Sequence, residues 1–207
     1  MKRIVVGLAV LTSITPLCVT ALHAQTVGNE PYPLGFGIAA GATFPMGDLG
    51  DAQGTGWNVE GLVDWTTPQT PLGFRADLAY SDLGGKTVTI PGQPDVKTDT
   101  RNVYQLTGDA VWHFRPSTTT TPNPWTPYII GGIGVYHFGD VTATSTTTQE
   151  QTSRGSSTDF GLNLGAGVIY RLSGFSTFGE ARFHNVFASG GSAKFFPVSF
   201  GLRFGGS

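Results

Sequence analysis

The sequence contains almost no cysteine and few charged residues. Of its 207 residues, one is cysteine and 13% are charged. The cysteine, Cys18, lies inside an apolar segment near the N-terminus, so the chain beyond it has no thiol. Disulfides, cysteine metal sites and cysteine nucleophiles are therefore excluded from the rest of the chain.

Long apolar runs are also missing beyond the N-terminal segment, which excludes a transmembrane helix there. The chain begins Met1-Lys2-Arg3, continues with an apolar run from Ile4 to about Leu22, and reaches a small residue at Ala24. A basic start, a short apolar core and a small residue before the cut are typical of a secretory signal peptide.

This pattern sets the expected domain boundaries. We predict that residues 1–24 are cleaved as a signal peptide, with Ala21 as the alternative cut site and an uncleaved anchor as the alternative role. Residues 25–33 then form a short lead-in, and residues 34–204 form the folded domain.

Basic residues are scarce as well. Without Lys2 and Arg3, the 12 basic residues become 10 against 14 acidic residues, a net charge of −4. A nucleic-acid-binding domain usually carries a basic patch, so we expect no nucleic-acid partner.

What the chain does contain is glycine, 30 residues, and a repeated two-residue alternation. In residues 159–172, DFGLNLGAGVIYRL, one set of positions is apolar and the other is small or polar. Successive side chains of a strand point to opposite faces, so this pattern predicts a strand with one apolar face. At fourteen residues it exceeds the roughly 5–6 of a soluble strand and the roughly 9–11 needed to cross a bilayer.

Seven further segments show the same alternation: residues 34–44, 57–65, 72–80, 102–114, 128–138, 175–187 and 196–204. Eight is an even number of strands, as single-chain bacterial barrels require. A protein without transmembrane helices can span a membrane only as a closed barrel, because only a closed sheet provides every backbone N–H and C=O group with a hydrogen-bond partner. The sequence therefore predicts an all-β fold, an eight-stranded antiparallel up-and-down transmembrane β-barrel.

Segment 128–138 is ambiguous, because both of its residue sets are apolar or glycine. By analogy with the other strands, we expect Tyr128, Ile130, Tyr136 and Phe138 to point outward.

The connections alternate in length. Four connections are long and polar: 46–56, 82–101, 139–158 and 188–194. Two are short, 66–71 and 173–174. The remaining turn, 115–125, is longer than the pattern requires. Long loops outside and short periplasmic turns are the outer-membrane arrangement. We expect the threonine-rich runs 117–121 and 142–148 to be low-complexity loop, and we expect no helix and no second domain.

Aromatic residues near both strand ends favour a membrane barrel over the alternative, a soluble barrel with its apolar set inside. Membrane–water interfaces select such aromatic girdles. We expect the girdles to include Trp57, Trp65, Phe74, Tyr80, Tyr104, Trp112, Tyr128, Phe160, Tyr170 and Phe204.

Charged residues occupy the opposite, inward set of positions. Buried charges must be paired or hydrated, and eight strands leave room only for side chains. The third and seventh strands, 72–80 and 175–187, lie across the barrel from each other if the strands close in order. We expect a salt-bridged plug built from Glu60, Arg75, Asp77, Asp109, Glu180, Arg182 and Arg203.

Five short motifs resemble the bacterial outer-membrane β-barrel domain family, which includes the opacity proteins and the OmpX- and OmpA-type barrels. They are residues 44–48 (FPMGD), 127–135, 165–170, 180–184 (EARFH) and 197–204. The resemblance implies outer-membrane lipid and lipopolysaccharide as surroundings, and recognition of the last strand by the barrel-assembly machinery. Family roles range over adhesion, host interaction and envelope stability, and the fold does not choose among them.

Three function classes remain. The leading expectation is a non-enzymatic, monomeric barrel that serves envelope structure or surface interaction through its loops, with a host or surface ligand as the partner. A narrow channel is the first alternative. The second is a barrel enzyme similar to lipid A deacylases, which use a His-x-Ser pair facing lipid; here Val186 follows His184 at that spacing, and His184 has inward parity. We expect no cofactor and no metal, because no ligand spacing recurs.

Overall fold

The structure, a computed structural model, describes residues 34–66, 70–89, 91, 95–114, 124–147, 150–189 and 191–205. The predicted signal peptide and lead-in, most of the 115–125 turn and the threonine run 117–121 lie outside these residues. Within the described part of the chain, no helix is long and apolar enough to cross a membrane.

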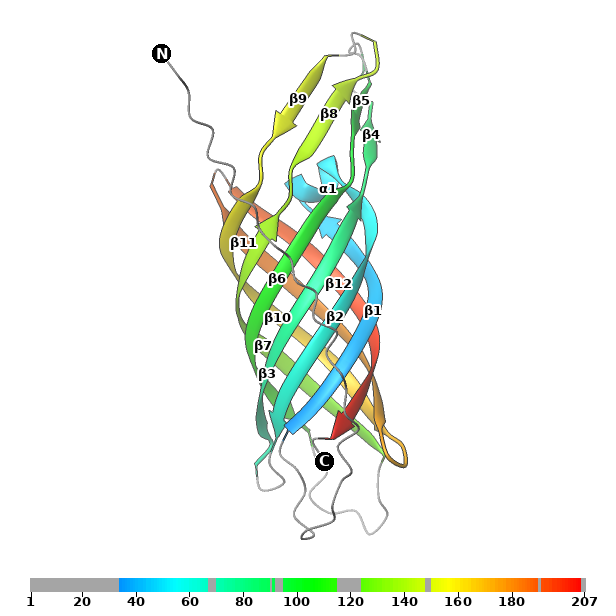
Figure 1. The fold of residues 1–207 in the computed structure, drawn as a ribbon, viewed down its shortest axis with the longest axis vertical. Helices are drawn as coiled ribbons and strands as arrows, with labels where there is room; N and C mark the ends of the chain where they lie inside the picture. The colour runs from blue at the N-terminus through cyan, green and yellow to red at the C-terminus, as the bar shows by residue number, and fades with distance from the viewer. Residues whose placement is uncertain are drawn as a thin grey trace, which may run out of the picture. The chain divides into compact units, whose positions relative to one another are not determined.

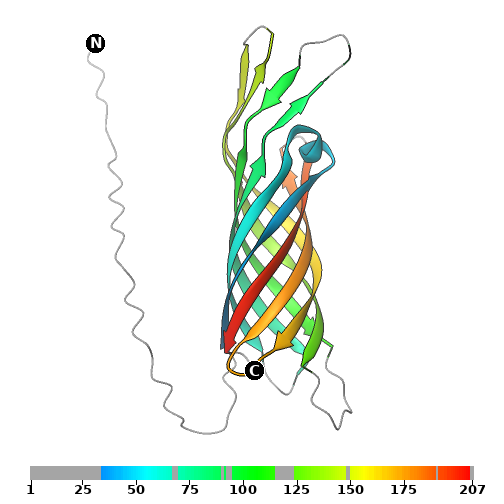
Figure 2. The ribbon, with the colours of Figure 1, turned by 90° about the vertical axis from the view of Figure 1, so that its right-hand side faces the viewer.

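Eight antiparallel strands form a closed barrel in the order β1-β12-β11-β10-β7-β6-β3-β2 (Figures 1 and 2). Closure pairs β1 with β12, so the barrel has no edge strand with unpaired backbone groups. The predicted fold is confirmed. The barrel strands are β1 Leu34–Met46, β2 Gly54–Thr66, β3 Leu72–Gly84, β6 Arg101–His113, β7 Trp125–Phe138, β10 Ser157–Arg171, β11 Ser176–Ala188 and β12 Gly191–Gly205.

The outer surface of the barrel is apolar. Leu164 on β10 is 67% exposed and Phe200 on β12 is 70% exposed, whereas the inward Arg182 on β11 is 3% exposed. A soluble protein would bury such side chains, but a barrel in lipid exposes them to hydrocarbon. For β1, β2, β3, β6, β10, β11 and β12, the inward and outward sets match the alternation in the sequence.

The orientation expected for β7 is wrong. Tyr128, Ile130, Tyr136 and Phe138 are at most 1% exposed and point inward, while Ile133 is 66% exposed and points outward. Residues directly opposite each other on neighbouring strands share a face. The pairing of β7 with β6 places Tyr128 opposite His113, so the inward face of β6 decides the orientation that β7 alone leaves open.

Two glycines on β10 make room for the inward tyrosines. A Cβ atom on Gly167 would lie 2.4 Å from the Tyr128 ring, and one on Gly161 would lie 2.8 Å from the Tyr136 ring. These are distances that real Cβ atoms do not adopt. Small residues on β10 therefore provide the volume that large residues of β7 fill.

Aromatic side chains lie in rows across neighbouring strands at both barrel ends. At the end that carries the long connections, the loop end, the ring centroids of Trp57 and Tyr80 are 5.4 Å apart and those of Tyr80 and Tyr104 are 5.0 Å apart. At the other end, the turn end, Trp65 and Phe74 are 6.1 Å apart. Phe160, Trp112, Tyr170 and Phe204 also lie on outward positions. Tyr128 does not belong to a girdle, because it is inside the barrel.

The interior is arranged in tiers. Toward the turn end lies an apolar cluster, and toward the loop end lies a second one. Charged side chains occupy the middle of the barrel between them. The first cluster comprises Ala39, Leu62, Val111, Tyr128, Ile130, Ile169 and Phe178, and the second Leu49, Leu83, Val103, Tyr136, Phe138, Val186 and Phe195.

The long loops contain regular structure that the sequence analysis did not predict. Between β1 and β2 lies a short helix, α1 (Asp48–Ala52), whose Leu49 is buried in the loop-end cluster. The expectation of no helix is therefore wrong. A single buried leucine on a five-residue turn gives too little periodicity to be recognised.

The second and third long loops form one four-stranded sheet, which we call the loop sheet. Its strands are β4 (Lys86–Val88), β5 (Val96–Thr98), β8 (Val141–Ser145) and β9 (Gln151–Arg154). The two hairpins join where β5 pairs with β8, and they extend beyond the barrel at the end where α1 lies (Figures 1 and 2). Residues 142–145 are thus strand rather than irregular loop. They have little apolar surface to bury, but the neighbouring hairpin supplies hydrogen-bond partners for their backbone.

The apolar outer face generates a stability test. Leu164→Arg places a charge near the middle of the span, so the free energy of unfolding should fall by about 2–4 kcal/mol. Phe160→Arg, on the same face four residues closer to the loop end, should cost about 0–1 kcal/mol, since charges near the interface are tolerated. Both are measured by urea titration of protein refolded into lipid vesicles, and equal costs at the two positions would contradict the membrane orientation of β10.

Candidate functional site

Arg182 is the centre of a charged cluster inside the barrel. Its Nη2 lies 2.9 Å from Asp77 and its Nη1 lies 3.1 Å from Asp109. Its Nε donates to Glu180, and a more distant contact of 3.9 Å reaches Glu60. One guanidinium thus contacts carboxylates from three strands besides its own, β2, β3 and β6, which is what its planar set of five donors allows.

A second cation joins the cluster from the opposite wall. Arg75 on β3 donates to Glu180 on β11 over 2.7 Å, and the two strands are four positions apart in the ring of eight. Tyr128 donates to the same carboxylate over 2.5 Å. Opposite walls of the barrel are therefore tied together across the bore.

The cross-bore pair forms although Arg75 has acidic neighbours on both sides. It lies opposite Asp64 on β2 and opposite Asp109 on β6. Each of those carboxylates bonds another arginine: Asp64 accepts from Arg203, and Asp109 accepts from Arg182. Asp109 also accepts from Asn163 over 2.6 Å. The pairing is therefore set by the whole network rather than by adjacent strands.

Arg203, which the sequence analysis placed in the same network, forms a separate pair. Its Nε donates to Asp64 over 2.6 Å, and a second guanidinium nitrogen contacts the other oxygen of that carboxylate. A Cβ atom on Gly35 would lie 2.8 Å from Asp64 and 3.1 Å from Arg203, so the pair needs glycine there. The other six predicted members, Glu60, Arg75, Asp77, Asp109, Glu180 and Arg182, lie together.

Several members of the interior were missed by the sequence analysis. Tyr128 and Tyr136 were assigned to the wrong face, and the polar layer of Thr43, Asn58 and Ser199 was not recognised. Asn58 donates to Thr43 over 3.0 Å and accepts from Ser199 over 2.8 Å. The inward glycines of β10 were the available signal for the orientation of β7. Small inward residues on one strand leave space that large inward residues of the neighbouring strand can fill.

His184 lies inside the barrel, as its parity predicts, and is fully buried. Its Nδ1 is 2.9 Å from the Tyr136 hydroxyl, and its ring stacks on Phe195 with centroids 4.8 Å apart. Among the described residues, no group of three or more His, Cys, Asp or Glu side chains is arranged to hold a metal ion.

The sequence profile described as outer membrane protein beta-barrel domain matches residues 10–204. The chain belongs to this family. Its place is therefore the outer membrane, and its exposed apolar face is the lipid-facing surface. A search of curated proteins found no match.

Solved structures share the family fold at low sequence identity. The crystal structure of Neisserial surface protein A (NspA) is 17% identical with a TM-score of 0.56, over 83% of this chain and 95% of that chain. A major outer membrane protein from Thermus thermophilus is 16% identical with a TM-score of 0.56, over 83% of this chain and 98% of that chain. At these identities the likeness concerns the fold.

The cross-bore pair generates a thermodynamic prediction. Glu180→Gln removes the carboxylate that Arg75 contacts, so it should lower the free energy of unfolding by about 3–5 kcal/mol. Arg75→Met should cost less, because Glu180 keeps its contacts with Arg182 and Tyr128. The double mutant should lose less than the sum, with a coupling energy of at least about 1 kcal/mol, measured by urea titration of refolded barrels.

A matched control combines Glu180→Gln with Arg203→Met, since Arg203 bonds Asp64 and not Glu180. Its two effects should add within about 0.5 kcal/mol. Equal coupling in both cycles would mean that the mutations act on general lumen charge and not on a specific pair.

Proposed function

We propose that the protein is a non-enzymatic, non-conducting outer-membrane barrel that presents a structured set of extracellular loops for envelope structure or surface interaction. The observation that carries this proposal is the Arg182 cluster, which contacts carboxylates around the bore. An eight-stranded barrel has an interior just wide enough for its own side chains.

The arrangement of the lumen favours a plug over the alternative, a narrow channel. The charges are paired with one another, so an ion passing through would have to displace buried carboxylate–guanidinium contacts of 2.7 to 3.1 Å. Apolar clusters lie on both sides of the charged tier, and such layers offer a passing ion no ligands.

The loop sheet supports a role in surface interaction. Pairing of Val96, Lys97 and Thr98 with Ser145, Thr144 and Ala143 joins two loops that are separate in sequence. A binding surface that is ordered before the partner arrives avoids the entropy cost of ordering loops on contact. Preorganised loops on a rigid barrel are therefore suited to recognising a host or surface ligand.

The environment of His184 favours a non-enzymatic role over a lipid-modifying enzyme. A base that acts on lipid must reach the outer surface, whereas His184 is buried within the lumen and held by Tyr136 and Phe195. Val186, at the position of the serine in a His-x-Ser pair, has no hydroxyl.

Export and assembly complete the proposal. Removal of residues 1–24 delivers the chain to the periplasm, and the barrel-assembly machinery inserts it among lipid and lipopolysaccharide as a monomer. The basic start and apolar core of the first residues, and the closed sheet without a free edge, support this route.

Planar-bilayer recording tests the plug. The wild-type barrel should show no steady open-channel current, because the charged tier fills the bore. Arg182→Ala should introduce current, since it removes the shared cation and leaves several carboxylates that repel each other and draw in water. A large-bore porin in the same membrane provides the detection control. A large, steady current through the wild-type barrel would contradict the plug and favour a channel.

A loop variant tests surface interaction. Replacing residues 141–154 by a short Gly-Ser turn removes β8 and β9 and leaves the β4–β5 hairpin without its neighbour. Cells displaying this variant should lose adhesion to epithelial monolayers, while the purified barrel still runs faster on a gel when unboiled. Lengthening the 172–175 turn at the opposite end is the control and should leave adhesion intact. Adhesion that survives loss of the loop sheet would assign the protein to envelope structure alone.

A further inference from the structure

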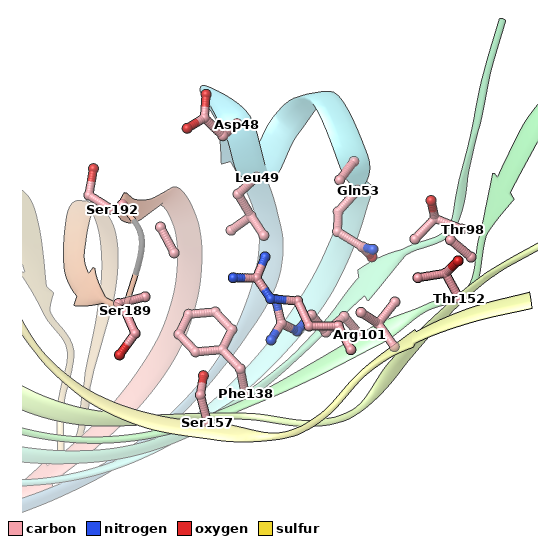
Figure 3. Close-up of a pocket in the computed structure, with 17 residues that line it drawn as sticks. Asp48, Leu49, Gln53, Thr98, Arg101, Phe138, Thr152, Ser157, Ser189 and Ser192 are labelled. Atoms are coloured by element: carbon pink, nitrogen blue, oxygen red, sulfur yellow. The ribbon is translucent and has the colours of Figure 1, made fainter.

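A cavity of about 300 Å³ lies at the loop end, lined by α1, the loop sheet and the adjoining ends of the barrel strands (Figure 3). It is separate from the charged cluster described above. Leu49 and Phe138 are the largest apolar residues of its lining, and two cations, Arg101 and Arg154, also line it. Five residues with hydroxyl groups are also part of the lining: Thr98, Thr152, Ser157, Ser189 and Ser192.

Arg101 is the unusual member of this lining. It is 8% exposed, yet no carboxylate lies within ion-pair distance of it among the residues that the structure describes. Its Nε donates to the Gly139 carbonyl over 3.1 Å, and its Cζ lies 4.9 Å from the centroid of the Phe138 ring. Figure 3 shows it among Leu49, Gln53 and Phe138.

The other buried arginines behave differently. Arg75, Arg182 and Arg203 are each about as buried as Arg101, and each contacts at least one carboxylate of the chain. Burying a cation without an anion is costly, and this chain avoids that cost everywhere else in its described interior. Asp140 and Asp159 act on Arg101 electrostatically, but neither forms an ion pair with it. Arg101 therefore lacks the direct carboxylate contact that the other buried arginines have.

The remaining charges of the lining favour an anion. Arg154, on the outer strand of the loop sheet, is exposed and forms no ion pair with any described residue. Asp48 is the one acidic residue of the lining, so the lining carries a formal charge of +1. Guanidinium groups bind carboxylate and phosphate oxygens in pairs, and hydroxyls can donate to the same oxygens.

We propose that this cavity binds a small organic anion, with its carboxylate or phosphate group on Arg101 and Arg154 and an apolar body against Leu49 and Phe138. The volume is about twice the roughly 150 Å³ of a cavity that accepts benzene, which suits a ring with one anionic group. The site goes beyond the proposed function, since it requires neither a closed lumen nor a surface partner.

Isothermal titration of the refolded full barrel in detergent micelles tests the site with four probes. Benzoate and phenyl phosphate share the ring and differ in the anionic group, inorganic phosphate lacks the ring, and benzyl alcohol lacks the charge. We expect one or both ring anions to bind, and inorganic phosphate and benzyl alcohol to bind at least about tenfold more weakly. The stronger of the two ring anions identifies the preferred group.

Variants locate the binding. Arg154→Gln removes an exposed cation, so it should lower the affinity for the preferred probe roughly tenfold without affecting refolding. Arg101→Gln should weaken it at least as much. Lys97→Gln is the matched control, because Lys97 is an exposed cation of the same sheet outside the cavity lining, and it should leave the affinity unchanged.

Two results would overturn the proposal. One is that neither ring anion binds the wild-type barrel at millimolar concentration. The other is an equal loss of affinity in Arg154→Gln and Lys97→Gln, which would mean that binding depends on the overall charge of the loops and not on this cavity. If Arg101→Gln fails to refold, Arg154→Gln and its control still decide between these outcomes.

Discussion

An arginine inside a narrow barrel has to meet a carboxylate, and much of this structure follows from that requirement. Eight strands leave no wide column of water to hydrate a guanidinium, so its charge is compensated by neighbouring side chains. Arg182 meets this requirement with four carboxylates and Arg75 with one from the opposite wall. The charges are thus paired with one another across the bore.

The pairing of charges also constrains residues that carry none. Gly35 leaves space for the Asp64–Arg203 pair. Gly167 leaves space for the Tyr128 ring, which in turn places a hydroxyl on Glu180. The abundance of glycine therefore has a packing cause: strands of a narrow barrel cannot all carry large inward side chains, so large residues on one strand face glycine on the next.

Prediction from the sequence succeeded where one strand carries enough contrast by itself. Residues 159–172 separate apolar from polar positions without help from neighbours, and the orientation follows. Segment 128–138 lacks this contrast, and only its pairing with β6 and β10 places Tyr128 inside. Inward parity selected six residues that lie in one cluster, but it also selected Arg203, which forms a separate pair with Asp64. The individual pairs could not be predicted, because strand stagger sets the heights at which Arg75 meets Glu180 while Arg203 remains with Asp64.

The loop end shows what the periodicity of strands cannot encode. Across the membrane, each residue faces either lipid or lumen, and a period of two describes both. Beyond the span this rule ends, and structure arises from contacts between loops, such as the pairing of β5 with β8 and the burial of Leu49 from α1. Inside the span, each buried arginine that the structure describes meets a carboxylate of the chain; at the mouth, Arg101 is buried without one. The charges of the lumen thus compensate one another through direct contacts, whereas the buried cation of the loop end is left with a backbone carbonyl and an aromatic ring as its close partners.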